Sequence, residues 1–462
     1  MLPIGPSGYG DSPYSALSAF AGNPLLIDLD ALGIDVDRAA HHDDYVDFES
    51  VTRFRERHLA RAWEAQRADP SPSYRAFVDR EARWLDDFSL YDALKRVHGG
   101  VEWTKWERGV RLRDPAALAQ ARLAHAPAIE LSKFTQWLFD EQWRALRRYA
   151  NERGIGLIGD IPIFVAHDSA DVWANQDLFK LDEEGMPTHI AGVPPDYFSA
   201  TGQRWGNPLY RWNLLRERGY SWWIDRFRAA LDRFDAIRLD HFIGFVRYWQ
   251  ISADEPTAIH GKWLKGPGRE LFDTVARALG AKELPLIAED LGAVTPRVSN
   301  LRKRLRLPGI RLIQFAFGTD PQAPSFLPHN HARNAVVYTG THDNDTIVGW
   351  FRDKGGSGET RTPEQAAKER EAALTYVGMT EADLATRPIH WEMIRLAMAS
   401  VARTAILPLQ DILGLGSEAR MNRPGKAEGN WRWRVAKDAI TPEVEERLRT
   451  LTITYGRSRG TS

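Results

Sequence analysis

The chain has 462 residues, of which 43% are hydrophobic and 27% are charged, and its formal net charge is −1. This balance is typical of a globular protein and excludes the strongly basic surface of a nucleic-acid-binding protein. Cysteine is absent, which excludes disulfides and thiolate chemistry, and no apolar run reaches the roughly 20 residues that span a bilayer. We therefore expect a cytoplasmic protein with neither nucleic-acid nor membrane partners.

The first 150 residues fall into two parts of different character. Residues 1–30 are rich in turn-forming Gly and Pro and are expected to form strand and loop at the start of the fold. In residues 31–150, Arg, Glu, Asp and Ala dominate, and apolar residues recur at spacings near three and four. That spacing predicts a mostly helical insertion.

From residue 155 onward, short apolar runs alternate with longer, mostly helix-like segments. The predicted strands are 155–159, 236–240, 284–289, 310–317, 335–339 and 405–409. Such alternation predicts an α/β fold with a parallel sheet. We expect a barrel core over 151–350, a second helical insertion over 351–400 and the C-terminal part of the barrel over 401–462.

Four of these strands are followed by an acid at the carboxyl end. The acids are Asp160, Asp240, Glu289 and Asp343. In a parallel α/β barrel, the C-terminal ends of several strands deliver the catalytic groups to one place. Arg238 lies two residues before Asp240, so both side chains should point to the same face of the strand, where the guanidinium favours an ionised carboxylate.

The segment 192–210 has neither helical nor strand periodicity and is rich in aromatic residues. Its length exceeds that of an ordinary connection and its aromatic content argues against disorder, so we expect a functional loop. The sequence contains no zinc motif of the H-E-x-x-H type, no Gly-rich nucleotide loop and no G-x-S-x-G nucleophile elbow. The adjacent pair His41 and His42 is interpreted as a surface loop, and neither a metal nor an organic cofactor is expected.

The acid set suits the cleavage of a glycosidic bond. That reaction needs one acid to protonate the leaving oxygen and one carboxylate to stabilise or capture the carbon that develops positive charge. Aromatic residues, which make up 11% of the chain, include several in polar loops, where their flat faces can stack on sugar rings.

Eight segments together resemble the amylomaltases, the bacterial 4-α-glucanotransferases of glycoside hydrolase family 77 that are related to the plant disproportionating enzyme. They are GYGDSPY at 8–14, GDIPIFV at 159–165, GVPPDYFS at 192–199, GQRWGNPLY at 202–210, RLDHF at 238–242, AEDLG at 288–292, TGTHDND at 339–345 and SEARMN at 417–422. The resemblance covers nearly the whole chain, and the joint occurrence of these segments is specific.

The resemblance implies a (β/α)8 TIM-type barrel with mostly helical insertions and a retaining mechanism. Asp240 would be the nucleophile, Glu289 the acid/base and Asp343 the stabiliser of the transition state. The residues implied to contact maltooligosaccharide and α-glucan substrates are Tyr14, Asp160, Asp196, Tyr197, Phe198, Trp205, Asn207, Arg238, His342 and Asn344. Transfer to a sugar also requires that water be kept from the glycosyl-enzyme, and the substrate loop 192–210 with its aromatic residues is the expected shield. The oligomeric state stays open.

Two departures from the family pattern carry expectations of their own. Ile243 stands where the family usually has arginine, so we expect weaker sugar binding or weaker local support. The start of the chain is similar to the end of the family's second barrel strand, so we expect a barrel that is incomplete at the N-terminus and lacks its first unit.

Two rival functions remain open beside glucan transfer. One is an α-amylase-like hydrolase that uses the same carboxylates. The other is an inactive glucan-binding relative, disabled by its short N-terminus. Incubation with maltotriose separates the three, because transfer produces longer oligosaccharides, hydrolysis produces shorter ones alone, and binding leaves the sugar unchanged.

Overall fold

The computed structural model describes residues 1–34, 44–195, 199, 201–356, 361–426 and 428–458. These residues form two compact units. Unit 1 contains residues 1–34, 48–194 and 201–305, and unit 2 contains residues 44–47, 195, 199, 306–356, 361–426 and 428–458. Each unit is described by itself.

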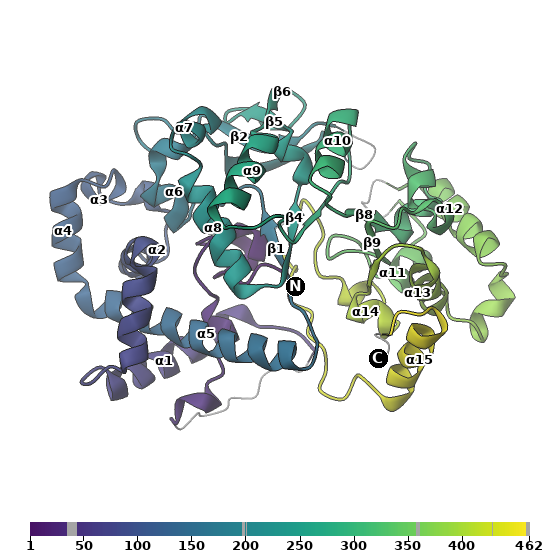
Figure 1. Ribbon diagram of the computed structural model, residues 1–462, viewed down its shortest axis with the longest axis horizontal. Helices are drawn as coiled ribbons and strands as arrows, with labels where there is room; N and C mark the ends of the chain where they lie inside the picture. The colour runs from purple at the N-terminus through teal and green to yellow at the C-terminus, as the bar shows by residue number, and fades with distance from the viewer. Residues whose placement is uncertain (35–43, 196–198, 200, 357–360, 427, 459–462) are drawn as a thin grey trace. The chain divides into compact units, whose positions relative to one another are not determined.

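Helices occupy much of the part of unit 1 that comes from the first third of the chain. They are α1 (Phe48–Gln66), α2 (Pro72–Val97), α3 (Arg108–Arg111), α4 (Pro115–Ala124) and α5 (Ala126–Glu152), as Figure 1 shows. On α5, Phe134 and Leu138, and then Phe139 and Trp143, are four residues apart and buried, as expected for the inner face of a helix. These helices lie within the segment for which the apolar spacing predicts helix.

Three parallel strands form the part of unit 1 that matters for the site. They are β1 (Ile158–Pro162), β4 (Ala236–Asp240) and β7 (Leu286–Ala288), and β4 pairs with the other two. Helices α6 (Ala170–Ala174), α7 (Trp212–Glu217), α8 (Ser221–Arg233), α9 (Arg269–Ala278) and α10 (Pro296–Arg304) fall between or after these strands in the chain. Because the strands are parallel, their carboxyl ends lie along the same edge of the sheet.

A second, antiparallel sheet of unit 1 corrects one prediction. Its order is β3 (Gln203–Pro208), β2 (His189–Val193), β5 (Arg247–Ser252) and β6 (Gly261–Lys265). The prediction of an aperiodic loop over 192–210 is therefore wrong at residues 192–193 and 203–208. Backbone hydrogen bonds to β2 define β3, and these need no alternation of side chains.

Unit 2 also contains three parallel strands. They are β8 (Gly309–Leu312), β9 (Ala335–Tyr338) and β10 (Thr404–Ile406), with β9 paired to both of the others. Its helices are α11 (Ile347–Arg352), α12 (Pro363–Tyr376), α13 (Ile389–Ala399), α14 (Leu409–Ile412) and α15 (Pro442–Thr454). The predicted strand 310–317 is too long, because a 3-10 helix (Ile313–Phe317) follows β8, and a continuous apolar run does not distinguish these two buried conformations.

The α/β class with parallel strands and substantial helical insertions is confirmed. Six parallel strands lie among the described residues: β1, β4, β7, β8, β9 and β10. Residues 1–30 form short 3-10 turns such as Pro13–Ser15 and Pro24–Leu26, and none of these described residues is in the strand that was expected there.

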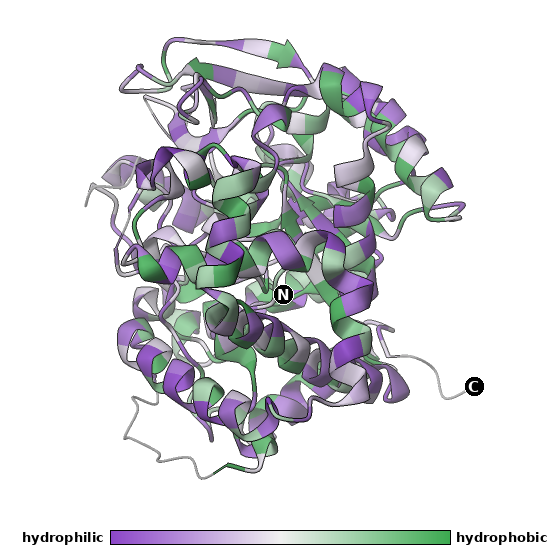
Figure 2. Ribbon diagram, turned by 90° about the vertical axis from the view of Figure 1, so that its left-hand side faces the viewer, coloured by the Kyte–Doolittle hydropathy of each residue, from purple (hydrophilic) through white to green (hydrophobic). Residues whose placement is uncertain are grey.

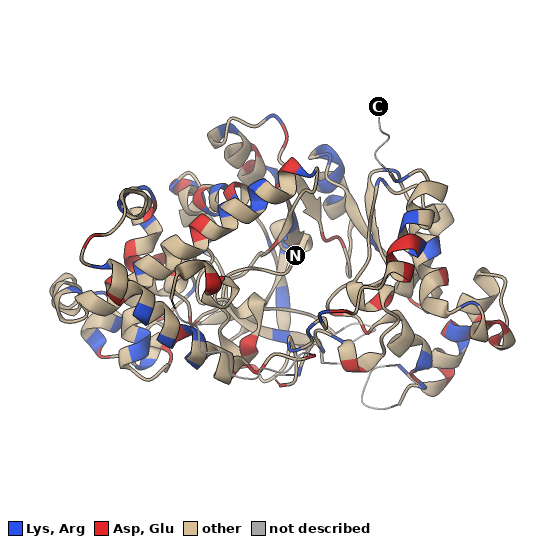
Figure 3. Cartoon of the chain, turned by 90° about the horizontal axis from the view of Figure 1, so that it is seen from below, with Lys and Arg blue, Asp and Glu red and all other residues tan. Residues whose placement is uncertain are grey.

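The surfaces of the helices are amphipathic and of mixed charge. Hydrophobic and hydrophilic residues alternate along the helices in Figure 2. Lys and Arg are interleaved with Asp and Glu in Figure 3. Arg269 and Asp273, one turn apart on α9, form an ion pair. Among the helices that the structure describes, none is both long enough and apolar enough to cross a bilayer.

Candidate active site

A buried arginine joins two acids from neighbouring strands. Asp160 on β1 is in register with Arg238 on β4, so the two side chains meet across the sheet. Arg238 Nη1 donates to Asp160 Oδ1 at 2.9 Å and to Oδ2 at 2.7 Å, and it also donates to Asp240 Oδ1 at 2.9 Å. The hydroxyl of Tyr14 donates to Asp160 Oδ2 at 2.8 Å. We call these four residues the Arg238 network.

The Arg238 network keeps its cation charged. Arg238 is 7% exposed, and burial alone would lower its pKa. The carboxylates of Asp160 and Asp240 outweigh burial and raise the pKa of Arg238 well above its ordinary value. The expectation that Arg238 and Asp240 share one face of the strand is confirmed, so Asp240 has a permanent positive charge beside it.

Glu289 follows the last residue of β7 and has the environment of a protonated acid. The residue is 8% exposed. Burial raises the pKa of its carboxyl well above the ordinary value; Arg238 acts in the opposite direction, and Asp240 adds to the increase. Its oxygens are held by two backbone groups, with His241 N donating to Oε2 at 2.7 Å and Leu291 N donating to Oε1 at 3.1 Å. The carboxyl group is therefore fixed in position, and its neutral form is favoured.

The contact between His241 and Glu289 depends on an unusual backbone conformation. His241 has φ 52° and ψ 52°, in the left-handed region, and this turn at the end of β4 points its N–H toward Glu289. The imidazole packs edge-on against the ring of Trp205, with centroids 4.8 Å apart and an interplanar angle of 89°. Burial lowers the pKa of His241 to about 4, so the ring is neutral at pH 7.

Trp205 and Asn207 on β3 have different surroundings. Trp205 is 36% exposed, which leaves aromatic surface open beside His241. Asn207 Nδ2 donates to the carbonyl of Val165 at 2.8 Å and so ties β3 to the segment after β1. Ile243 is 2% exposed, so this chain has an apolar core contact at the position where an arginine was expected.

In unit 2, Asp343 lies in a tight turn after β9. Asn344 Oδ1 accepts from Thr341 N at 2.8 Å and from Thr341 Oγ1 at 2.9 Å, which closes the turn around Asp343. His342 Nε2 lies 3.4 Å from Asp343 Oδ2. The side chain of Asp343 is 44% exposed, whereas that of His342 is 13% exposed.

Two residues from a distant loop support this turn. Asn422 Nδ2 donates to Asp343 Oδ1 at 2.6 Å, and Arg420 Nη2 donates to the backbone oxygen of Asp343 at 2.9 Å. The sequence prediction assigned no role to either residue, although both belong to the segment 417–422 that carries part of the family resemblance. Their polar side chains in that segment were the available signal.

The predicted site residues thus fall into separate groups. Tyr14, Asp160, Arg238 and Asp240 form one network, and Glu289 and Trp205 both contact His241. Asp343, His342 and Asn344 form the turn of unit 2. Asp196, Tyr197 and Phe198 lie outside the described residues.

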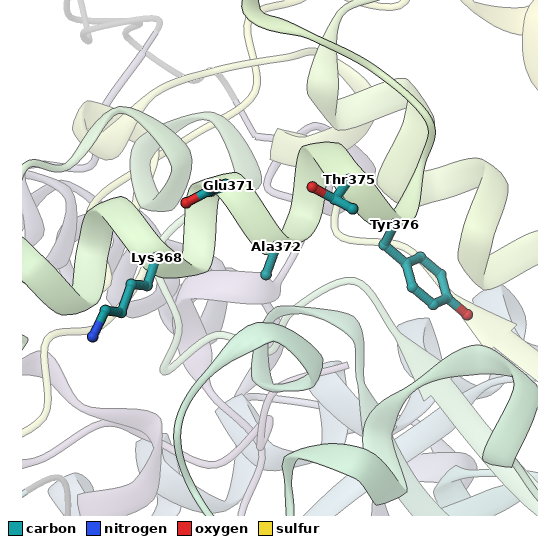
Figure 4. Close-up of a pocket in the computed structure, with 5 residues that line it drawn as sticks. All are labelled: Lys368, Glu371, Ala372, Thr375 and Tyr376. Atoms are coloured by element: carbon teal, nitrogen blue, oxygen red, sulfur yellow. The ribbon is translucent and has the colours of Figure 1, made fainter.

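Two other kinds of site, a metal centre and a surface pocket, have less support among the residues that the structure describes. No cluster of three His, Cys, Asp or Glu side chains that could hold a metal ion occurs in this part of the chain. An open pocket beside α12 is lined by Lys368, Glu371, Ala372, Thr375 and Tyr376 (Figure 4). It contains a single carboxylate, whereas the strand ends of unit 1 supply an acid with a raised pKa and an ion-paired carboxylate.

Comparison with known proteins agrees with this chemistry. The sequence profile of glycoside hydrolase family 77, described as 4-alpha-glucanotransferase, matches residues 1–440. A 4-alpha-glucanotransferase of Thermus thermophilus is 48% identical over 98% of this chain and 90% of its own length. One from Synechocystis is 43% identical over 99% of this chain and 90% of its own length.

Solved structures of amylomaltases are also similar to this chain. An amylomaltase from Streptococcus agalactiae in complex with acarbose is 34% identical, with a TM-score of 0.90 over 99% of this chain and 91% of that chain. An amylomaltase from Corynebacterium glutamicum, at 17% identity and a TM-score of 0.73, shares the fold. These comparisons do not support the expectation that a first barrel unit is missing. The chain belongs to the 4-alpha-glucanotransferase family, glycoside hydrolase family 77.

Proposed function

We propose that the chain is a retaining 4-α-glucanotransferase that moves α-1,4-glucan segments between maltooligosaccharides. One observation carries the mechanism: Glu289 has a raised pKa at the end of β7, and Asp240 is paired with a cation at the end of the neighbouring strand β4. A retaining glycosidase needs this combination of a protonated acid and an ionised carboxylate.

In the first step, the glycosidic oxygen takes the proton of Glu289 while Asp240 attacks C1 of the donor sugar. The C1–O bond to the leaving chain breaks, and a bond from C1 to the carboxylate oxygen of Asp240 forms. Arg238 favours the ionised form of Asp240, from which the attack proceeds. Asp343 is the proposed counter-charge for the positive charge that develops at C1.

In the second step, Glu289 is ionised and acts as a base. It removes the proton from the 4-hydroxyl of an acceptor sugar, and the acceptor oxygen attacks C1 as the bond to Asp240 breaks. Two displacements at the same carbon retain the α configuration, and Glu289 recovers its proton. The role of Glu289 thus alternates between acid and base, which suits a carboxyl with a raised pKa.

The substrate class follows from the surroundings of the acids. Trp205 offers an exposed aromatic face beside His241, and such faces stack on the apolar faces of sugar rings. The similar S. agalactiae amylomaltase is described in complex with acarbose. We assign Tyr14, Asp160, Arg238, Asn207, His342 and Asn344 to contacts with the glucan or to the support of those contacts.

Incubation with maltotriose tests this function. Transfer gives glucose together with maltotetraose and longer chains, and Asp240→Asn removes both products. Shortening of maltotriose without longer products would indicate an α-amylase-like hydrolase. Binding of maltotriose without any turnover would indicate the inactive relative.

A further inference from the structure

We propose that Asn422 is a positioning residue that fixes the orientation of the carboxylate of Asp343, the proposed counter-charge of the transition state. This inference rests on the function proposed above and adds a residue to the machinery that surrounds Asp343. The two side chains meet although they come from segments far apart in the sequence, the turn after β9 and the loop that begins at Ser417.

Three hydrogen bonds tie the loop to the turn, and a fourth, from Arg420 to Asn422, braces the loop itself. Asn422 Nδ2 donates to Asp343 Oδ1 at 2.6 Å, and Asn422 N donates to the backbone oxygen of His342 at 3.0 Å. Arg420 Nη2 donates to the backbone oxygen of Asp343 at 2.9 Å, and Arg420 Nε donates to the carbonyl of Asn422 at 2.8 Å. The backbone and the side chain of Asp343 are therefore both held by the same short segment.

Further contacts make this segment rigid. Ser417 Oγ donates to Asp345 Oδ2 at 2.6 Å, and Asp345 in turn lies within ion-pair distance of Arg420. Trp431 N donates to the carbonyl of Met421 at 2.6 Å, and the ring of Trp431 packs on His342 at 5.7 Å. The donor group of Asn422 thus starts from a fixed position and does not have to be ordered when the substrate arrives.

Asparagine suits position 422 because its side chain is a neutral hydrogen-bond donor. An ionised carboxylate only accepts hydrogen bonds, so the amide atom that faces Asp343 is the NH₂ group. A carboxylate at position 422 would instead compete with Asp343 for one proton. A neutral donor orients Asp343 without cancelling the negative charge that the transition state requires.

Asp343 needs such a partner because its side chain is 44% exposed. An exposed aspartate has several accessible rotamers, and packing does not select among them. The hydrogen bond from Asn422 to Oδ1 selects one orientation, with Oδ2 on the side of His342. A small misplacement of a catalytic group can lower the rate about 10²-fold.

The test is the pH dependence of kcat for maltotriose transfer by two variants, each expressed as a ratio to the wild-type value. Asn422→Ala removes the donor and should lower kcat about 10²-fold across the pH range. Asn422→Asp should approach wild-type activity at acid pH, because a proton shared between the two carboxyl groups restores the hydrogen bond. Its ratio should fall as pH rises, because both groups then ionise and repel each other.

Asn334→Asp is the matched control, because Asn334 is an exposed asparagine of unit 2 that donates to the carbonyl of Arg306 at 3.1 Å. Its ratio should stay near one at every pH. An Asn422→Ala variant within about twofold of wild type, or an Asn422→Asp ratio that does not change with pH, would overturn the inference. If the wild-type protein transfers no glucan from maltotriose, the proposed function itself fails, and the inference fails with it.

Discussion

Glu289 in unit 1 and Asp343 in unit 2 have carboxyl groups in different surroundings. Glu289 in unit 1 is buried, and removal from water favours its neutral form. Asp343 in unit 2 is half-exposed and is oriented by hydrogen bonds from a loop. The difference teaches that the surroundings of a carboxyl group can suit it to donate a proton, as proposed for Glu289, or to act as a fixed negative charge, as proposed for Asp343. Burial determines the protonation state, and directional donors determine the orientation.

The largest effect is expected from Asp240→Asn, which tests whether the ion-paired acid of unit 1 is the covalent group. Loss of a nucleophile lowers kcat by a factor on the order of 10⁴–10⁶. The measurement is the rate of glucose release from maltotriose. The thermal unfolding midpoint serves as a control for folding, and retention of more than a tenth of the activity would contradict the assignment.

Glu289→Gln tests the role of burial and should lower transfer about 10²–10⁴-fold. The proposed mechanism uses the protonated form of Glu289, so wild-type activity should be present below the raised pKa of this group and should be lost as pH rises through it. The variant should lack this decline. A maltosyl fluoride donor, whose fluoride leaves without protonation, should restore the first step.

The matched control for Glu289→Gln is Glu369→Gln, since Glu369 is a buried glutamate of unit 2 that is paired with Arg361. This change should leave the decline at high pH in place. The same pH profile for both glutamine variants would mean that Glu289 is not the acid.

The next effect concerns stability and compares the two units directly. Arg238→Met leaves Asp160 and Asp240 without their shared cation, and the loss of one partner from a buried pair lowers the free energy of unfolding by about 3–5 kcal/mol. Asn422→Ala removes one hydrogen bond to a half-exposed carboxylate, so we expect a loss of about 1 kcal/mol. Urea unfolding of both variants measures the two losses of unfolding free energy. Equal losses would mean that the buried ion pairs of Arg238 contribute no more to stability than the hydrogen bond to the half-exposed Asp343.

The smallest effect is expected at Asn344, which closes the turn around Asp343. Asn344→Ala leaves Thr341 N and Thr341 Oγ1 without their acceptor and should lower the free energy of unfolding by about 0.5–1 kcal/mol. Transfer should fall more in Asn422→Ala than in Asn344→Ala, because Asn422 contacts the carboxylate itself. A reversed order of the two rates would point to the turn, and not to the loop, as the support of Asp343.

Sequence reasoning placed Arg238 beside Asp240 because the rules it used are geometric. Parallel strands end at one edge, and residues two apart on a strand share a face, which places Arg238 beside Asp240. The helices before β1 follow from their apolar spacing.

The features of the site that were not predicted depend on contacts between distant segments, which cannot be read from the sequence. The pairing of Asp160 with Arg238 requires the register of β1 and β4, and the contact between Asn422 and Asp343 joins segments that are distant in the chain. The left-handed turn at His241 is also not predictable from the sequence, because positive φ is uncommon for any residue other than glycine, histidine included. Strand β3 depends on pairing with β2 and has no alternation of its own.

The Arg238 network also constrains how the sequence can change. One guanidinium pairs with both Asp160 and Asp240, so a substitution at Asp160 changes the electrostatic environment of Asp240 as well. Mutations at these positions should therefore be epistatic, with effects that differ strongly between single and combined variants. A library that varies Asp160 or Arg238 alone would sample mostly damaged proteins, whereas coordinated changes at both positions offer the accessible route to an altered binding site.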